Sequence, residues 1–255
     1  MPLFKRILKE PEPVAIETPR VERRSTKRYA INPQFPLKAV LSLIARDDTG
    51  APMSHSRHGW NWKGRLIDCS EQGVRIQMGP VIKASIGEPC DLMLSVEDFE
   101  LTIPCHIVNT REQDEGMVFG LKHDIENDAT RNTYRQLIEV VALGSTLKPQ
   151  ARHTKPDDSG YLVERYASDR PACLSIWRHP ADQSVAAFEF QLKDNLVRAS
   201  AGQTIEYLTG ADAAAARKAT PAQSTEIQWL FQWVVSNLAP VVPADVREFL
   251  QYYAT

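Results

Sequence analysis

The sequence predicts a mainly β protein with added helices: an antiparallel barrel or sandwich with a following helix, and then a C-terminal α+β domain. Short runs that alternate apolar and polar residues fill positions 37–123, with turn residues and no helical period between them. A longer stretch of helical spacing follows these runs, after residue 128. A chain of 255 residues that is 43% hydrophobic is long enough for two domains of ordinary size.

The first of these domains is expected over residues 21–147. Its strands should lie in 37–43, 64–69, 73–78, 90–96, 101–109 and 117–123. The Gly, Pro and Ser content of 46–62 indicates a long loop after the first strand. The helix should begin at Asp128 as N-cap and pack across the strands through side chains at helical spacing, namely Tyr134, Leu137, Ile138 and Val141.

The second domain is expected over residues 159–255, after a polar linker at 148–158 that contains two prolines. Antiparallel strands should occupy 160–167, 172–179, 184–192 and 194–200, and helices should follow in 225–238 and 243–253, the last with Pro243 in its first turn. Trp229 and Trp233 stand four residues apart in the first of these helices, a spacing that fits core packing or an exposed aromatic docking face.

A basic N-terminal arm contrasts with a mildly acidic body. The net charge is −2, yet the first 28 residues hold eight Lys and Arg against four Glu. Residues 1–20 are expected to be a flexible arm that meets an anionic partner or remains solvated. If the first ten residues form a helix, one face is apolar and the other basic, a pattern typical of membrane-surface or partner docking; the apolar residues are Leu3, Phe4, Ile7 and Leu8, and the basic ones Lys5, Arg6 and Lys9.

Other features favour a cytoplasmic protein that is not an enzyme. The four cysteines lack the spacing of a zinc site and are expected to be reduced, mostly buried thiols. His55 and His58 form an isolated pair without a third metal ligand, and no glycine-rich phosphate loop or catalytic motif is recognisable. Neither a signal peptide nor a membrane span is predicted, and no metal or cofactor is expected.

Two short motifs contain the candidate ligand-binding residues. Arg24 and Arg28 precede the first long strand, and their guanidinium groups suit phosphates, guanine edges or base faces. Asp68 and Ser70 lie in a turn, where a carboxylate could accept from guanine N1–H and N2–H and a hydroxyl could donate or accept. Gly73 would permit positive φ and leave room for a ligand. Together they describe a guanine nucleotide site, although Asp68 and Ser70 could instead cap the turn while the arginines are solvated.

The sequence "RSTKR" at 24–28 followed by "DCSEQG" at 68–73 resembles the paired motifs of the PilZ domain, Arg-x-x-x-Arg and then Asp/Asn-x-Ser-x-x-Gly. The later runs "GEPCDLMLSV", "LTIPCHIVNTRE" and "GMVFGLKHD" are similar to that family's later strands, so the resemblance covers about residues 21–145. It implies a six-stranded antiparallel β-barrel with a following helix. The 40 residues from Arg28 to Asp68 make a long separation for this family, and the excess is assigned to the loop at 46–62, where Trp60 or Trp62 could stack on a base or pack on the barrel.

The resemblance implies a bacterial receptor for cyclic di-GMP. Arg24 and Arg28 would hold phosphates and guanine edges, Asp68 and Ser70 would bond a guanine, and Gly73 would leave space. Arg23 resembles the extra arginine of members that bind two intercalated ligand molecules. Binding would order the arm, and the C-terminal domain would carry the output to a protein partner that the sequence does not identify. The alternatives are a nucleotide-independent adaptor with this fold and a nucleic-acid binder, which the acidic body disfavours.

Overall fold

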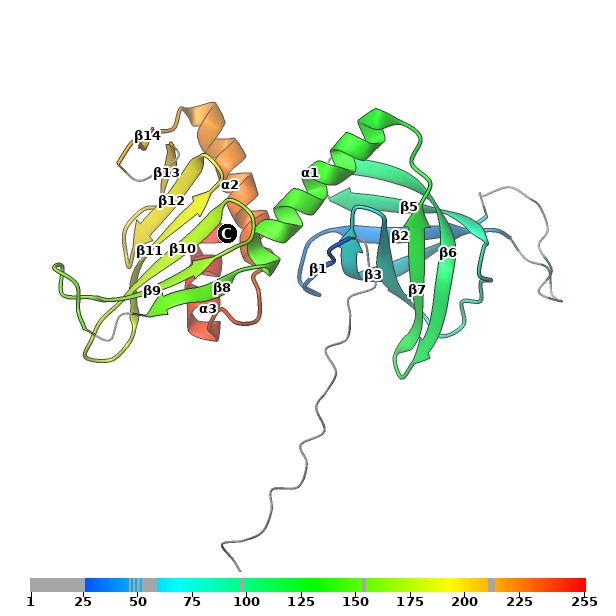
Figure 1. The fold of residues 1–255 in the computed structure, drawn as a ribbon, viewed down its shortest axis with the longest axis horizontal. Helices are drawn as coiled ribbons and strands as arrows, with labels where there is room; N and C mark the ends of the chain where they lie inside the picture. The colour runs from blue at the N-terminus through cyan, green and yellow to red at the C-terminus, as the bar shows by residue number, and fades with distance from the viewer. Residues whose placement is uncertain are drawn as a thin grey trace, which may run out of the picture.

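The computed structural model describes residues 26–45, 47, 49, 51, 59–96, 99–152, 155–210 and 214–255. Arg23, Arg24 and the pair His55 and His58 lie outside these residues. The chain forms two β-sheet units with helix α1 (Asp128–Ser145) running between them (Figure 1).

The first unit is a closed antiparallel barrel. Six strands follow one another in the order β3-β2-β5-β6-β7-β4, and β4 pairs back with β3. The predicted six-stranded barrel with a following helix is therefore confirmed. Its strands are β2 (Lys38–Leu43), β3 (Trp60–Ser70), β4 (Gly73–Met78), β5 (Pro89–Val96), β6 (Phe99–Gln113) and β7 (Gly116–His123), together with a short added strand, β1 (Tyr29–Ala30).

Strand β3 has two partners along one edge because it is long. Strand β2 pairs with its first part, Trp60–Gly64, and β1 pairs with Asp68 and Cys69 near its end. This added pairing brings the chain just before Tyr29 next to the β3–β4 hairpin. Trp60 and Trp62 belong to β3 and not to the expected loop at 46–62: Trp60 is exposed, whereas Trp62 packs against the barrel core.

Helix α1 closes the barrel with the side chains that helical spacing predicted, because Tyr134, Leu137, Ile138 and Val141 are all buried in the barrel core. The helix begins one residue earlier than expected. Asn127, and not Asp128, is its N-cap, and the Asn127 side chain accepts a hydrogen bond from the Ala129 N–H.

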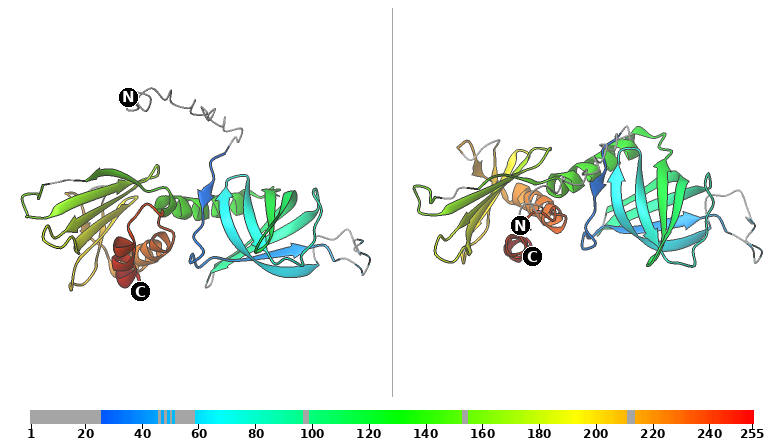
Figure 2. Two further views of the ribbon diagram at one scale, coloured as in Figure 1. Left: turned by 90° about the horizontal axis from the view of Figure 1, so that it is seen from below. Right: turned by 60° about the horizontal axis from the view of Figure 1, so that its bottom comes forward.

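The second unit is a seven-stranded antiparallel sheet in the order β14-β13-β12-β11-β10-β9-β8, with two helices on one face (Figure 2). The C-terminal strands followed by helices are thus confirmed, but the stretch 148–158 is not only a linker, since it begins with strand β8, which pairs with β9. The elements are β8 (Lys148–Arg152), β9 (Leu162–Ala167), β10 (Ala172–Arg178), β11 (Val185–Leu192), β12 (Asn195–Ser200), β13 (Glu206–Thr209), β14 (Arg217–Lys218), α2 (Pro221–Ser236) and α3 (Ala244–Ala254).

The two C-terminal helices start differently from the prediction. Helix α2 begins at Pro221, before the expected 225, because Thr220 and Gln223 form a capping box. Pro243 is the N-cap of α3 and not a residue of its first turn.

The two units share helix α1. Its middle packs in the barrel core, whereas Leu143 and the following Leu147 belong to the core of the second sheet. Gly144 lets α1 approach α2 closely, since an added Cβ would lie 2.6 Å from the Val234 carbonyl oxygen. Buried Asn237 then joins three segments: it accepts from the Asn32 N–H at 2.7 Å and donates to the carbonyl oxygens of Ala30 and Val141.

The expected state of the cysteines is confirmed: all four are free, and all except the half-buried Cys173 are buried. Among the residues that the structure describes, no helix has both the length and the apolar character needed to cross a bilayer.

Candidate functional site

The β3–β4 hairpin holds three of the predicted site residues. Its tight turn at 71–72 sets Ser70 opposite Gly73, and two positions further along each strand it sets Asp68 opposite Arg75. Strand β1 lies on the other edge of β3, where Ala30 pairs with Asp68. Arg28 therefore enters the hairpin from a segment 40 residues away in sequence.

Asp68 is bonded by two arginines. Its Oδ1 accepts from Arg28 Nη1 at 2.6 Å, and its Oδ2 accepts from Arg75 Nε at 2.5 Å and from the Nη2 of the same side chain. The carboxylate is nearly buried, at 4% exposed, whereas the side chains of Arg28 and Arg75 are 25% and 44% exposed. The two guanidinium groups thus extend from a buried anchor toward the surface.

Ser70 forms hydrogen bonds through its hydroxyl and its carbonyl oxygen. Its hydroxyl donates to the Gly73 carbonyl oxygen at 3.0 Å, and its own carbonyl oxygen accepts from the buried Tyr134 hydroxyl at 3.1 Å. The side chain is buried. Ser70 therefore fixes the turn and attaches it to helix α1, which agrees with the local bonding that was the alternative interpretation of this residue.

At position 73, glycine is required for packing and not for a positive φ. Its φ is not positive, so the turn does not need glycine for a left-handed conformation. An added Cβ would instead overlap the carbonyl oxygen of Leu121 on the neighbouring strand β7. The residue therefore permits close packing of β4 on β7, and the expected room for a ligand at this position stays a prediction.

Two other ionisable side chains near the arginines, Cys69 and His123, are uncharged. Burial, followed by the neighbouring Asp68 carboxylate, raises the pKa of Cys69 to about 12. Burial lowers the pKa of His123 to about 4, and its ring packs edge-on against Tyr134 at 4.5 Å. Both groups are neutral near pH 7, so the charge of this region comes from the buried Asp68 carboxylate and from a rim that includes Arg28 and Arg75.

The second unit contributes to that rim through the β9–β10 turn. Asp169 forms an ion pair with Lys27, the residue before Arg28. Arg170 donates from Nη2 to the Tyr29 hydroxyl at 2.8 Å and lies over that ring, 5.6 Å from its centroid. The pKa of Lys27 is lowered by burial and then by two cations of the second unit, Lys148 and Arg170, which shows how closely the positive charges gather here.

The structure brings together four predicted residues, Arg28, Asp68, Ser70 and Gly73, whereas Arg23 and Arg24 lie outside its described part. Sequence reasoning missed Arg75, although counting outward from the turn at 71–72 pairs residue 68 with residue 75. It also missed Asp169 and Arg170. No local signal marks them, because their contacts depend on the packing of the two units.

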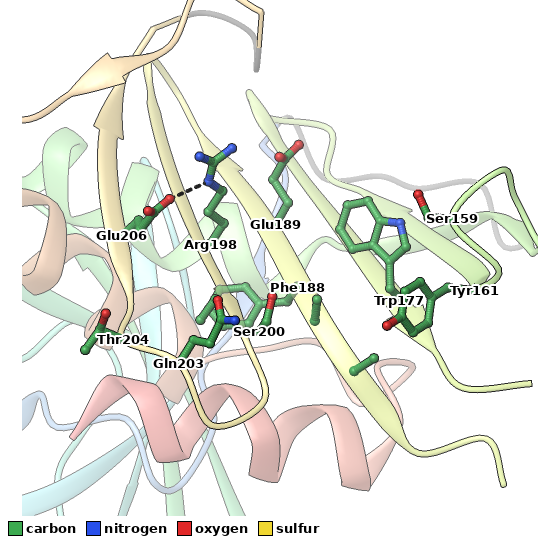
Figure 3. A pocket seen from close by; sticks show the side chains of 13 residues that line it. Ser159, Tyr161, Trp177, Phe188, Glu189, Arg198, Ser200, Gln203, Thr204 and Glu206 are labelled. Carbon is green, nitrogen blue, oxygen red and sulfur yellow. Dashed lines mark hydrogen bonds and ion pairs between the residues drawn. The ribbon is translucent and has the colours of Figure 1, made fainter.

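A separate hollow of about 520 Å³ lies on the outer face of the second sheet (Figure 3). Trp177 and Tyr161 stand at one end, and the other end carries Glu189 and the ion pair in which Arg198 Nε donates to Glu206 at 2.7 Å. The predicted site residues that the structure describes, Arg28, Asp68, Ser70 and Gly73, do not line it.

The geometry defines a closed antiparallel β-barrel with an arginine-rich rim at one hairpin and a helix across the barrel. Residues 22–140 match the family model described as the PilZ domain. This part of the chain is therefore a PilZ domain, which confirms the resemblance seen in the motifs.

Among solved structures, the chain is similar to the PilZ domain with c-di-GMP of YcgR from Escherichia coli. The sequence identity is 9%, the match covers 46% of this chain and 89% of that chain, and the TM-score is 0.35. A comparison with curated proteins finds no match.

Proposed function

We propose that the PilZ domain of this chain is a receptor for cyclic di-GMP and that the second unit relays the bound state. The observation that carries the proposal is the contact of Arg28 with Asp68. The two motifs that resemble the family's ligand motifs are far apart in sequence, and Arg28 of the first meets Asp68 of the second at one surface hairpin.

The arginines supply the chemistry for a cyclic dinucleotide. Arg28 and Arg75 are held by one carboxylate, so their planar donor groups are partly ordered before a ligand arrives. Each can bond a phosphate in two places or lie against a guanine ring. Arg24 and Arg23 precede this pair in the chain and are proposed to close over the ligand from the arm.

The main proposed role of Asp68 is to orient these arginines. Little of its carboxylate faces solvent, and three donor atoms already bond it. A carboxylate has about four acceptor positions, so one is available while the three donors are bound, and a second becomes available for a guanine N–H if Arg28 moves toward the ligand. Ser70 and Gly73 are proposed to serve the site by shaping the hairpin on which Asp68 stands.

The relay is proposed to run through Lys27, Tyr29 and the β9–β10 turn. A ligand phosphate near Arg28 would compete with Asp169 for Lys27, because both are anions that pair with the same ammonium group. Any shift of the segment before β1 would also change the geometry of the Arg170–Tyr29 hydrogen bond and of the hydrogen bonds of Asn237. The second unit would then present the change to a protein partner.

A nucleotide panel tests the receptor assignment. Calorimetry with cyclic di-GMP, cyclic di-AMP, GTP and an RNA oligomer should show tight binding of the first ligand alone. Adenine presents an acceptor at N1 and no N2 amine, so cyclic di-AMP cannot make the guanine pairing. Binding of none of the four would favour the nucleotide-independent adaptor, and binding of RNA alone would favour the nucleic-acid binder.

The relay has its own test in hydrogen exchange. Saturating cyclic di-GMP should change the exchange rates of the β9–β10 turn around Asp169 in the wild type. The Asp169→Ala variant should bind the ligand at least as well, since an anion has left the rim, but its turn should respond less. Equal responses of the two proteins would remove the Lys27–Asp169 pair from the relay.

A further inference from the structure

An apolar groove lies where the barrel meets helices α1 and α2. Phe99 of β6 and Val140 of α1 form one side, and Trp229, Leu230 and Trp233 of α2 form the other. Its volume is about 400 Å³, within the usual range of binding pockets. None of these residues belongs to the arginine-rich rim.

The groove presents stacked aromatic rings to solvent. Trp229 is 41% exposed and stacks on Trp233 with ring centroids 6.0 Å apart. Trp233 in turn packs edge-on against Phe99 and Phe35 of the barrel unit. The inner ring is therefore held by the fold, whereas the outer ring leaves a large apolar face uncovered, which is typical of an interaction site.

We propose that residues 1–10 of the same chain dock in this groove as a short amphipathic helix. Leu3, Phe4, Ile7 and Leu8 have the spacing that places them on one face of a helix. A helix-in-groove contact uses such anchors one turn apart. The docked face would cover Trp229.

The charges of the two surfaces are complementary. The proposed helix carries Lys5, Arg6 and Lys9, whereas the groove is lined by the acidic Glu226 and, among the other described lining residues, by uncharged side chains. On the barrel side, Glu100 follows Phe99 in β6 and is exposed. Opposite charges beside an apolar contact favour this occupant over a second copy of the groove, which would bring the Glu226 and Glu100 carboxylates of two molecules together.

The intervening chain is long enough for docking within one molecule. Phe35 touches Trp233 beside the groove and stands nine residues after Thr26, so Thr26 lies within about 30 Å of that contact. Residues 9–26 can extend to about 55 Å at ~3.3 Å per residue. Tethering would give the arm a high effective concentration at the groove even if the isolated peptide binds weakly.

The first test uses the full-length chain and the exposure of Trp229 to acrylamide, taken as the difference in quenching between the wild type and Trp229→Phe. The double variant Leu3→Asp/Ile7→Asp should raise quenching of Trp229 and leave the far-ultraviolet circular dichroism unchanged. Unchanged quenching would overturn the proposal. Quenching that instead depends on protein concentration, with a dimer in sedimentation, would also overturn it and assign the groove to a second copy.

The second test supplies the arm as a labelled peptide of residues 1–12, added to a chain that starts at residue 13. Every buried core residue of the described structure lies at position 29 or later, so this deletion leaves both cores complete. Peptide binding should saturate and should weaken at least about tenfold in Trp229→Ala, as for a central aromatic anchor.

Two controls make this result specific. Trp60→Ala removes another exposed tryptophan, 60% exposed and outside the groove, and should leave peptide binding unchanged. A peptide with Leu3 and Ile7 replaced by Asp should not bind. Equal weakening by the two tryptophan variants would overturn the proposal, as would a peptide that binds phosphatidylglycerol vesicles but not the truncated chain.

Discussion

Replacing Asp68 by Asn should destabilise the barrel by about 2–3 kcal/mol. The carboxylate makes charge-assisted bonds to Arg28 and Arg75, and bonds of this kind contribute about 1.5–3 kcal/mol each. The full sum is not expected, because both guanidinium groups are partly exposed and can be rehydrated when their partner loses its charge. In a chain of this length the loss corresponds to a decrease of about 5–10 °C in Tm.

Urea unfolding followed by circular dichroism measures this loss. The matched control is Asp128→Asn, which breaks an Asp–Arg pair with Arg131 on the surface of α1, where Asp128 is 85% exposed. That variant should change the free energy of unfolding by less than about 1 kcal/mol. Equal losses in the two variants would refute the idea that buried Asp68 anchors the two arginines.

Three further predictions concern the site and the residues near it. Gly73→Ala should destabilise the protein by about 1–3 kcal/mol, because the added Cβ would overlap the Leu121 carbonyl oxygen. The control Gly79→Ala, whose Cβ would meet no atom within 4 Å, should change the free energy of unfolding by less than about 0.5 kcal/mol. Similar urea midpoints for the two variants would contradict the packing role of Gly73. The folded-state pKa of His123, about 4, is below its unfolded value, so the free energy of unfolding should fall by up to about 3 kcal/mol as the pH drops from about 6.5 toward 4. In urea titrations at several pH values, His123→Phe should abolish this dependence, whereas the control His179→Gln should keep it. Calorimetry should give two cyclic di-GMP molecules per wild-type chain and one for Arg23→Leu, because a second ligand brings more phosphates that need a cation, and a wild-type ratio of one would exclude the intercalated pair.

The barrel and its hairpin were predictable because each depends on local patterns. Alternating side chains fixed the strands that precede and follow the turn at 71–72, and the burial of Tyr134 followed from helical spacing. The packing reason for Gly73 was not predictable, because it depends on the distance between β4 and β7, which no spacing in the sequence encodes.

The elements that were missed have weak local signals. Strand β1 is only two residues long, and β8 is polar and contains Pro149, so both are stabilised by pairing with longer strands. The contacts of Asp169 and Arg170 with the motif segment depend on the packing of the two units, which share helix α1: its middle lies in the barrel core and its C-terminal end in the second core. The proposed division into a domain at 21–147 and a domain at 159–255 must therefore account for a helix that packs in both cores.

The most direct test of the central claim is a calorimetric titration of cyclic di-GMP into the wild type, Arg28→Ala and Arg65→Ala. Arg65 lies on the same hairpin, is exposed and bonds Gln77, so it matches Arg28 in charge without contacting Asp68. We expect at least about tenfold weaker binding for Arg28→Ala, from the loss of one charge-assisted bond, and an unchanged affinity for Arg65→Ala. Wild-type affinity in a folded Arg28→Ala variant would contradict the central claim.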